Sequence, residues 1–121
     1  MAYRHDNYLQ TEVLSADPLK LVHLLYRAAI DAIGAARRHL ASGEIAERSR
    51  KITKAWDILQ ELRQSLDDAH DAELSRSLRG LYAYMQGRLL EANAQQADAP
   101  LAEVEQLLRT LYEGWAAAAG A

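Results

Sequence analysis

The chain has 121 residues, of which 50% are hydrophobic and 26% are charged, and its formal net charge is -3 at pH 7. This length and composition are typical of a single globular domain and exclude an intrinsically disordered chain. Positive and negative residues are interleaved, so no basic face indicates a nucleic-acid partner. The absence of cysteine excludes disulfide bonds and thiolate chemistry.

The beginning of the chain, MAYRHDNYLQTE, lacks the continuous apolar run of a secretory signal. No stretch of about 18 apolar residues occurs, so we expect no membrane insertion. The sequence therefore predicts a soluble cytoplasmic protein. Residues 1–16 form a predicted N-terminal cap segment that is too short for a stable isolated helix, so we expect it to dock on the rest of the chain or to fray.

The first helix is predicted to begin at Asp17 and Pro18 and to run to about Leu40. Proline suits the first helical position because its missing N–H has no partner there, and Asp17 can cap the free N–H groups of the first turn. Two adjacent apolar stripes give this helix the broad apolar face of a bundle helix. The stripes are Leu21, Leu25, Ala28, Ala32, Ala36 and Leu40, and Val22, Tyr26, Ala29 and Ile33. Gly43 suits the left-handed position that ends a helix.

The second helix is predicted from about Ile45 to Leu66, and its apolar residues repeat in heptads. The repeating positions are Ile45, Ile52, Leu59 and Leu66, with Ala55 and Leu62 at the second heptad position and Trp56 and Ile58 beside them. Such heptads are typical of left-handed bundle packing. A polar turn follows, made of Asp67, Asp68, His70 and Asp71.

The third helix is predicted from about Ala72 to Gln96. Its apolar face is made of Leu74, Leu78, Leu81, Met85, Leu89 and Ala92. Gly80 and Gly87 lie inside this helix, where each costs about 1 kcal/mol relative to alanine. Two explanations stay open: close approach of a neighbouring backbone, or a groove kept open for a partner.

The fourth helix is predicted to open at Asp98-Ala99-Pro100 and to run from about Pro100 to Trp115. Leu101, Val104, Leu108, Leu111 and Trp115 recur in it at 3-4 spacing. Short connections force neighbouring helices to be antiparallel. We therefore predict an all-α fold, an antiparallel up-down-up-down four-helix bundle over residues 17–116, with a frayed tail at 117–121.

No catalytic or metal-binding pattern stands out. A di-iron bundle needs paired Glu-x-x-His motifs, and none occurs. The histidines are spread over separate elements, at His5, His23, His39 and His70. His23 and His39 lack the sequence context of a phosphorylated histidine. There is no nucleophile elbow and no phosphate-binding loop. We therefore expect no enzyme activity, no metal and no cofactor.

Three stretches of the chain resemble the flagellin export chaperones of the FliS family. The first is Tyr8 to Ala29, with Ser15-Ala16-Asp17-Pro18 where the family often has Thr-Ala-Ser-Pro, and Leu25-Tyr26-Arg27-Ala28-Ala29 where it often has Leu-Tyr-Asp-Gly-Ala. The second is Lys54 to Asp67, KAWDILQELRQSLD. The third is Leu81-Tyr82-Ala83-Tyr84-Met85 with the downstream Arg88-Leu89 and Ala92-Asn93. The three occur in order over almost the whole chain, which makes the resemblance specific.

The resemblance implies a cytoplasmic chaperone that is not an enzyme. Its partner would be the disordered C-terminal segment of flagellin, which it would keep from polymerising early and help deliver to the export apparatus. A component of the export gate is implied as a further partner. A disordered segment can lay short helices into the grooves of a small bundle, and we expect the bundle itself to be a monomer or weak dimer.

Eight residues form the cargo-binding groove that we predict on this basis. They are Val22, Tyr26, Ile58, Leu62, Leu81, Tyr84, Met85 and Asn93. Tyr82 and Tyr84 lie two positions apart and cannot share a helix face. We also predict that Tyr8, Leu9 and Val13 form an N-terminal lid, which covers an apolar groove until cargo arrives.

Two other functions remain open. The heptads of the second and fourth helices could serve a dimer seam, which would make the protein a self-association or scaffold module without cargo binding. The same groove could also bind other flagellar factors as a regulator. The sequence does not separate these functions from flagellin binding.

Overall fold

The structure of the protein is a computed structural model that describes residues 18–69 and 71–120. The predicted cap by Asp17 and the predicted lid residues Tyr8, Leu9 and Val13 lie outside the described residues. The described part consists of four helices, α2 (Pro18–Ala41), α3 (Ile45–Gln64), α4 (Ala72–Gln95) and α5 (Asp98–Gly120), without a strand. This arrangement confirms the predicted all-α bundle.

Local chemistry explains where the helices begin and end. Gly43 has a φ of 75°, the left-handed conformation predicted after the first helix. The second helix ends at Gln64, two residues earlier than predicted, and the Ser65 hydroxyl at its end donates to the carbonyl of Leu62. Asp71 caps α4 by accepting from the N–H of Leu74 at 3.0 Å.

The fourth helix is longer than predicted. It begins at Asp98, which brings a carboxylate to the positive end of the helix. It also continues past Trp115 to Gly120 through a run of alanines, which have the highest helix propensity. The tail at 117–121 therefore lies within this helix as far as Gly120.

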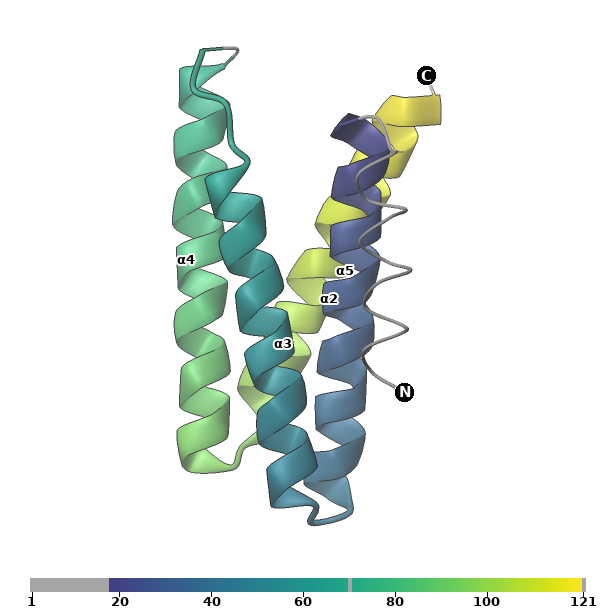
Figure 1. Ribbon diagram of the computed structural model, residues 1–121, viewed down its shortest axis with the longest axis vertical. Coiled ribbons are helices and arrows are strands. Elements are labelled where there is room, and N and C mark those ends of the chain that lie inside the picture. The colour runs from purple at the N-terminus through teal and green to yellow at the C-terminus, as the bar shows by residue number, and fades with distance from the viewer. Residues whose placement is uncertain (1–17, 70, 121) are drawn as a thin grey trace.

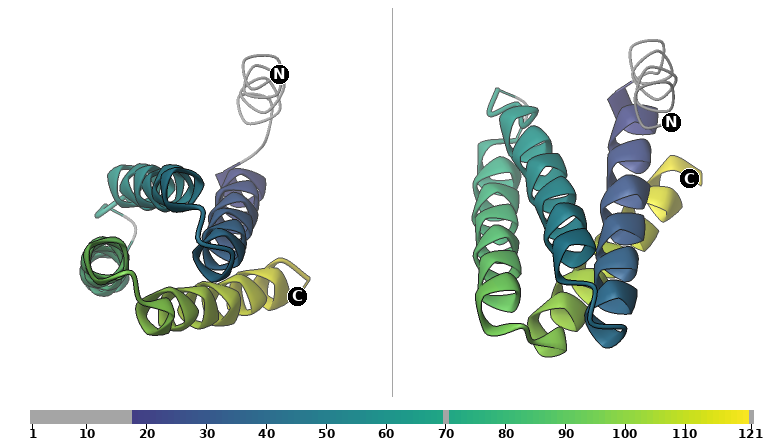
Figure 2. Two further views of the ribbon diagram at one scale, coloured as in Figure 1. Left: turned by 90° about the horizontal axis from the view of Figure 1, so that it is seen from below. Right: turned by 60° about the horizontal axis from the view of Figure 1, so that its bottom comes forward.

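Each helix packs against two others, in the pairs α2 with α3, α3 with α4, α4 with α5 and α5 with α2. Figure 1 shows the α3–α4 pair and the α2–α5 pair close together where α2 turns into α3 and α4 turns into α5, and diverging toward the opposite end. Figure 2 shows the same divergence from two other directions, with α5 crossing the bundle obliquely. The bundle therefore has a closed end and an open end.

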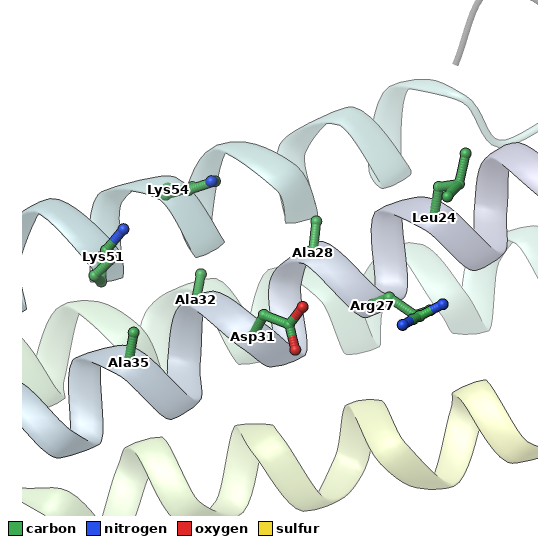
Figure 3. A pocket seen from close by; sticks show the side chains of 8 residues that line it. All are labelled: Leu24, Arg27, Ala28, Asp31, Ala32, Ala35, Lys51 and Lys54. Atoms are coloured by element: carbon green, nitrogen blue, oxygen red, sulfur yellow. The ribbon is translucent and has the colours of Figure 1, made fainter. Parts of the chain in front are cut away.

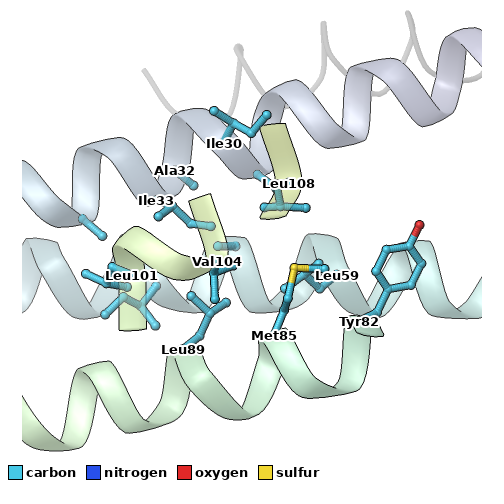
Figure 4. Close-up of a cluster of buried hydrophobic side chains, with 14 of the residues drawn as sticks. Ile30, Ala32, Ile33, Leu59, Tyr82, Met85, Leu89, Leu101, Val104 and Leu108 are labelled. Atoms are coloured by element: carbon cyan, nitrogen blue, oxygen red, sulfur yellow. The ribbon is translucent and has the colours of Figure 1, made fainter. Parts of the chain in front are cut away.

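One hydrophobic core runs through the bundle, and Figure 4 shows its central part. Its largest fully buried aliphatic side chains are Ile33, Ile52, Leu59, Leu62, Leu89, Leu101, Val104 and Leu108. Full burial of such a side chain contributes roughly 1.5–3 kcal/mol. The heptad residues of α3 and α5 thus pack inside the bundle, and Ile45, which is 56% exposed, is the exception among them.

Close backbone approach does not explain the glycines of α4. A Cβ placed on Gly80 or Gly87 would meet no heavy atom within 4 Å. Both positions are exposed on the outer face of the helix. Of the two explanations offered by the sequence, the close approach is therefore wrong.

Candidate functional site

An apolar pocket lies at the open end of the bundle, and we call it the end pocket. Its volume is about 190 Å³. All four helices contribute apolar side chains to its lining, which comprise Val22, Leu62, Leu66, Leu74, Leu78, Tyr82 and Trp115. The divergence of the helices explains the pocket, because the core side chains no longer reach across the bundle there.

The rim of the end pocket is made by the turn between α3 and α4. Leu74 stands in the first turn of α4 and is 46% exposed, so it presents apolar surface at the mouth. Asp67 and Asp71 also line the pocket. Both carboxylates accept backbone hydrogen bonds, Asp67 from Ala69 and Asp71 from Leu74. They therefore shape the turn as well as giving the rim a negative charge.

Two tyrosines join α2 to α4 beneath the pocket. The hydroxyls of Tyr26 and Tyr82 are 2.5 Å apart and share a hydrogen bond, and their ring centroids are 6.4 Å apart. Burial raises the pKa of both phenols, and for Tyr82 the neighbouring Tyr26 adds to the rise. Both phenols are therefore neutral at physiological pH.

A second group of contacts ties α4 to α5. The Tyr84 hydroxyl donates to Glu103 at 2.9 Å, and the Arg88 guanidinium donates to the same carboxylate at 2.6 Å. The hydrogen bonds from Arg88 and then from Tyr84 hold the pKa of Glu103 below its usual value. The side chain of Tyr84 is 48% exposed, so part of its ring is still available to a partner.

The eight predicted groove residues do not form one continuous surface. Tyr26, Leu62 and Met85 are at most 2% exposed and belong to the core. Val22, Ile58 and Leu81 are partly buried against that core, and Asn93 accepts a hydrogen bond from the Ser49 hydroxyl at 3.0 Å. The end pocket brings together Val22 and Leu62. Cargo binding by any of the eight stays a prediction.

The apolar stripes predicted from the sequence include Leu66, Leu74, Leu78 and Trp115, but the predicted binding groove does not contain them. Periodicity marks a face of a helix, and it does not show where two helices begin to diverge. Asp71 could have indicated the position of Leu74, because an N-cap at Asp71 places Leu74 in the first turn of α4, where its side chain is exposed.

No group of three or more histidine, cysteine, aspartate or glutamate residues in the described ranges is arranged to hold a metal ion. The helices of these ranges are also not long and apolar enough to cross a membrane. The end pocket can therefore bind apolar side chains of a partner.

Comparison with known proteins gave consistent matches. The family model described as "Flagellar protein FliS" matches residues 1–121. The flagellar secretion chaperone FliSB of Pseudomonas aeruginosa is 35% identical over 107 residues, which cover 88% of this chain and 85% of the relative. The flagellar secretion chaperone FliS of Salmonella typhimurium is 33% identical, with 88% of this chain and 80% of the relative covered.

A solved structure supports the fold. The structure titled "Crystal structure of flagellar chaperone from bacteria" superposes with a TM-score of 0.81. It shares 19% sequence identity, and the match covers 98% of this chain and 97% of the other. The same bundle is therefore formed by a distantly related sequence.

Proposed function

The chain belongs to the FliS family of flagellar proteins, a family of secretion chaperones and not of enzymes, and from this premise we propose that its cargo is the C-terminal segment of flagellin. In this proposal the chaperone acts in the cytoplasm, keeps the segment from polymerising early and hands it over at the export apparatus. A cargo of this kind is disordered before binding and folds on the chaperone surface.

The observation that carries the proposal is the apolar end pocket with the exposed side chain of Leu74 at its mouth. An amphipathic cargo helix could bury one or two side chains in this pocket, as in other helix-in-groove complexes. The ordering of a disordered cargo costs about 2–5 kcal/mol of the gross interaction energy. Such a cost keeps the affinity moderate for the area buried, which suits a cargo that must be released for export.

The test is calorimetric titration of the full chain with a peptide of roughly the last 45 residues of the flagellin from the same organism, long enough for several helices at 1.5 Å rise per residue. We expect one-to-one binding with a large negative heat-capacity change, the mark of apolar burial coupled to folding. Absence of binding to the wild-type chain would reject flagellin as the cargo.

A matched pair of variants tests the end pocket separately. Leu74 and Leu90 are both exposed leucines on α4, 46% and 58% respectively, but Leu74 lines the pocket and Leu90 does not. We expect Leu74→Gln to weaken cargo binding by about tenfold, because roughly 1.5 kcal/mol of apolar burial is lost. Leu90→Gln should change the affinity for the cargo by less than about twofold. Equal effects of the two substitutions would remove the end pocket from the proposal.

A further inference from the structure

A groove distinct from the end pocket runs along the seam between α2 and α3. Its volume is about 300 Å³. Figure 3 shows the methyl groups of Ala28, Ala32 and Ala35 on α2 pointing toward α3, with Lys51 and Lys54 on the opposite helix. Ala28 and Ala35 are partly exposed, and their small side chains let the backbone of a docked helix approach closely, whereas Ala32 is only 4% exposed. We call this feature the α2–α3 groove.

The charged residues of the α2–α3 groove are mostly positive. Arg27, Lys51 and Lys54 line it together with one carboxylate, Asp31. This excess of positive charge contrasts with the whole chain, whose formal net charge is -3. It also contrasts with the end pocket, whose charged lining residues are Asp67 and Asp71.

The three cations of the groove are not neutralised within the part of the chain that the structure describes. None of them forms an ion pair there, although Asp31 lies in the same groove and Asp57 lies one turn beyond Lys54 on α3. Most other arginines on the surface of the bundle are paired with carboxylates. The paired ones are Arg37, Arg50, Arg79, Arg88 and Arg109.

We propose that the α2–α3 groove binds an acidic amphipathic helix of the exported cargo. The small apolar side of that helix would lie on Ala28 and Ala35, and its flanking carboxylates would pair with Arg27, Lys51 and Lys54. This inference rests on the proposed chaperone function and adds a second attachment point of defined charge. The opposite charges of the groove and the end pocket would fix the direction in which the cargo wraps around the bundle.

The experiment uses the full chain and the same flagellin peptide. The double variant Lys51→Glu with Lys54→Glu reverses the charge of the groove. Its control, Arg38→Glu with Arg76→Glu, makes an equal change in net charge at two exposed arginines outside both sites. Melting temperatures of all variants would be compared first, so that only folded proteins enter the titration.

We expect the groove variant to bind the peptide about tenfold more weakly than wild type at roughly 50 mM salt, and the control to bind within about twofold. The difference should shrink at about 300 mM salt, because ionic screening weakens surface charge pairs. If the peptide binds wild type but the two double variants lose affinity equally, the electrostatic attraction is not specific to the groove, and the groove does not bind an acidic helix. If wild type itself does not bind, the proposed function fails with it.

Discussion

The hydrogen bond between Tyr26 and Tyr82 allows a quantitative test of how the open end of the bundle is held together. The two hydroxyls are 2.5 Å apart, and the side chains are 0% and 2% exposed. Replacement of tyrosine by phenylalanine removes one hydroxyl and keeps the ring, so packing is largely preserved. The change in stability therefore reports on the hydrogen bond.

The structure predicts unequal costs for the two single substitutions. Tyr26→Phe leaves the Tyr82 hydroxyl beside the end pocket, where water can reach it, so we expect a loss of about 1 kcal/mol. Tyr82→Phe leaves the Tyr26 hydroxyl deep in the core beside the indole of Trp115. An indole N–H only donates, so the phenol proton has no acceptor, and we expect about 2 kcal/mol.

The double variant removes both partners and leaves no orphaned hydroxyl. We expect it to be about 1 kcal/mol less stable than wild type, so the coupling energy of the cycle is about 2 kcal/mol. Urea unfolding followed by far-ultraviolet circular dichroism measures all four proteins, with an unchanged m-value as the control for an intact native state. Additivity of the two single losses within about 0.5 kcal/mol would refute the description of a mutually satisfied buried pair.

Three further substitutions test the fold. Leu59→Ala should cost about 3 kcal/mol in urea unfolding, because Leu59 is fully buried in the core, and a loss under about 1 kcal/mol would contradict that position. Gly87→Ala should raise stability by about 1 kcal/mol, because the site is helical and a Cβ there would meet no other atom within 4 Å. A lower melting temperature would show that the added methyl group clashes with a neighbour. Burial raises the pKa of Glu105, but hydrogen bonds from Arg37 and Arg109 outweigh it and hold the pKa below the usual 4.5. The resulting stabilisation is present above pH 4.5 and is lost as the pH falls through the lowered pKa. Between about pH 6 and pH 3 the stability of Arg37→Gln should therefore decrease less steeply than that of wild type, by a few tenths of a kcal/mol, as thermal melts would measure. Parallel curves of melting temperature against pH would exclude the contact.

The sequence predicted the helices well because their signals are local. A stripe at 3-4 spacing, a glycine after the first helix and an aspartate before α4 each act within a few residues. The contacts that fix the arrangement of the helices are not local. Arg37, for example, donates to Asp98 at 2.8 Å and to Glu105 at 2.9 Å, across 61 and 68 positions of the chain. Nothing in the sequence near Arg37 indicates those partners.

The candidate site was predictable only in part for the same reason. Tyr26 lies on the second of two adjacent apolar stripes and Met85 lies on the predicted apolar face of its helix, and neither pattern decides between burial in the core and exposure to a partner. In the structure both are fully buried, and the pocket is instead lined by Leu74 and Trp115 at the ends of their helices. The position of the pocket depends on the divergence of four helices, which is a property of the whole bundle.

A gradient of side-chain size along the bundle accounts for that divergence. At the closed end the buried positions of α2 and α4 include Ala32, Ala36 and Ala92, and such small side chains let helices approach each other closely. Toward the open end the space between the helices holds Tyr26, Tyr82 and Trp115. Interhelical distance follows the size of the side chains at the contact, so the aromatic residues hold the helices apart. The residues that stabilise the open end are thus also the ones that create the pocket there.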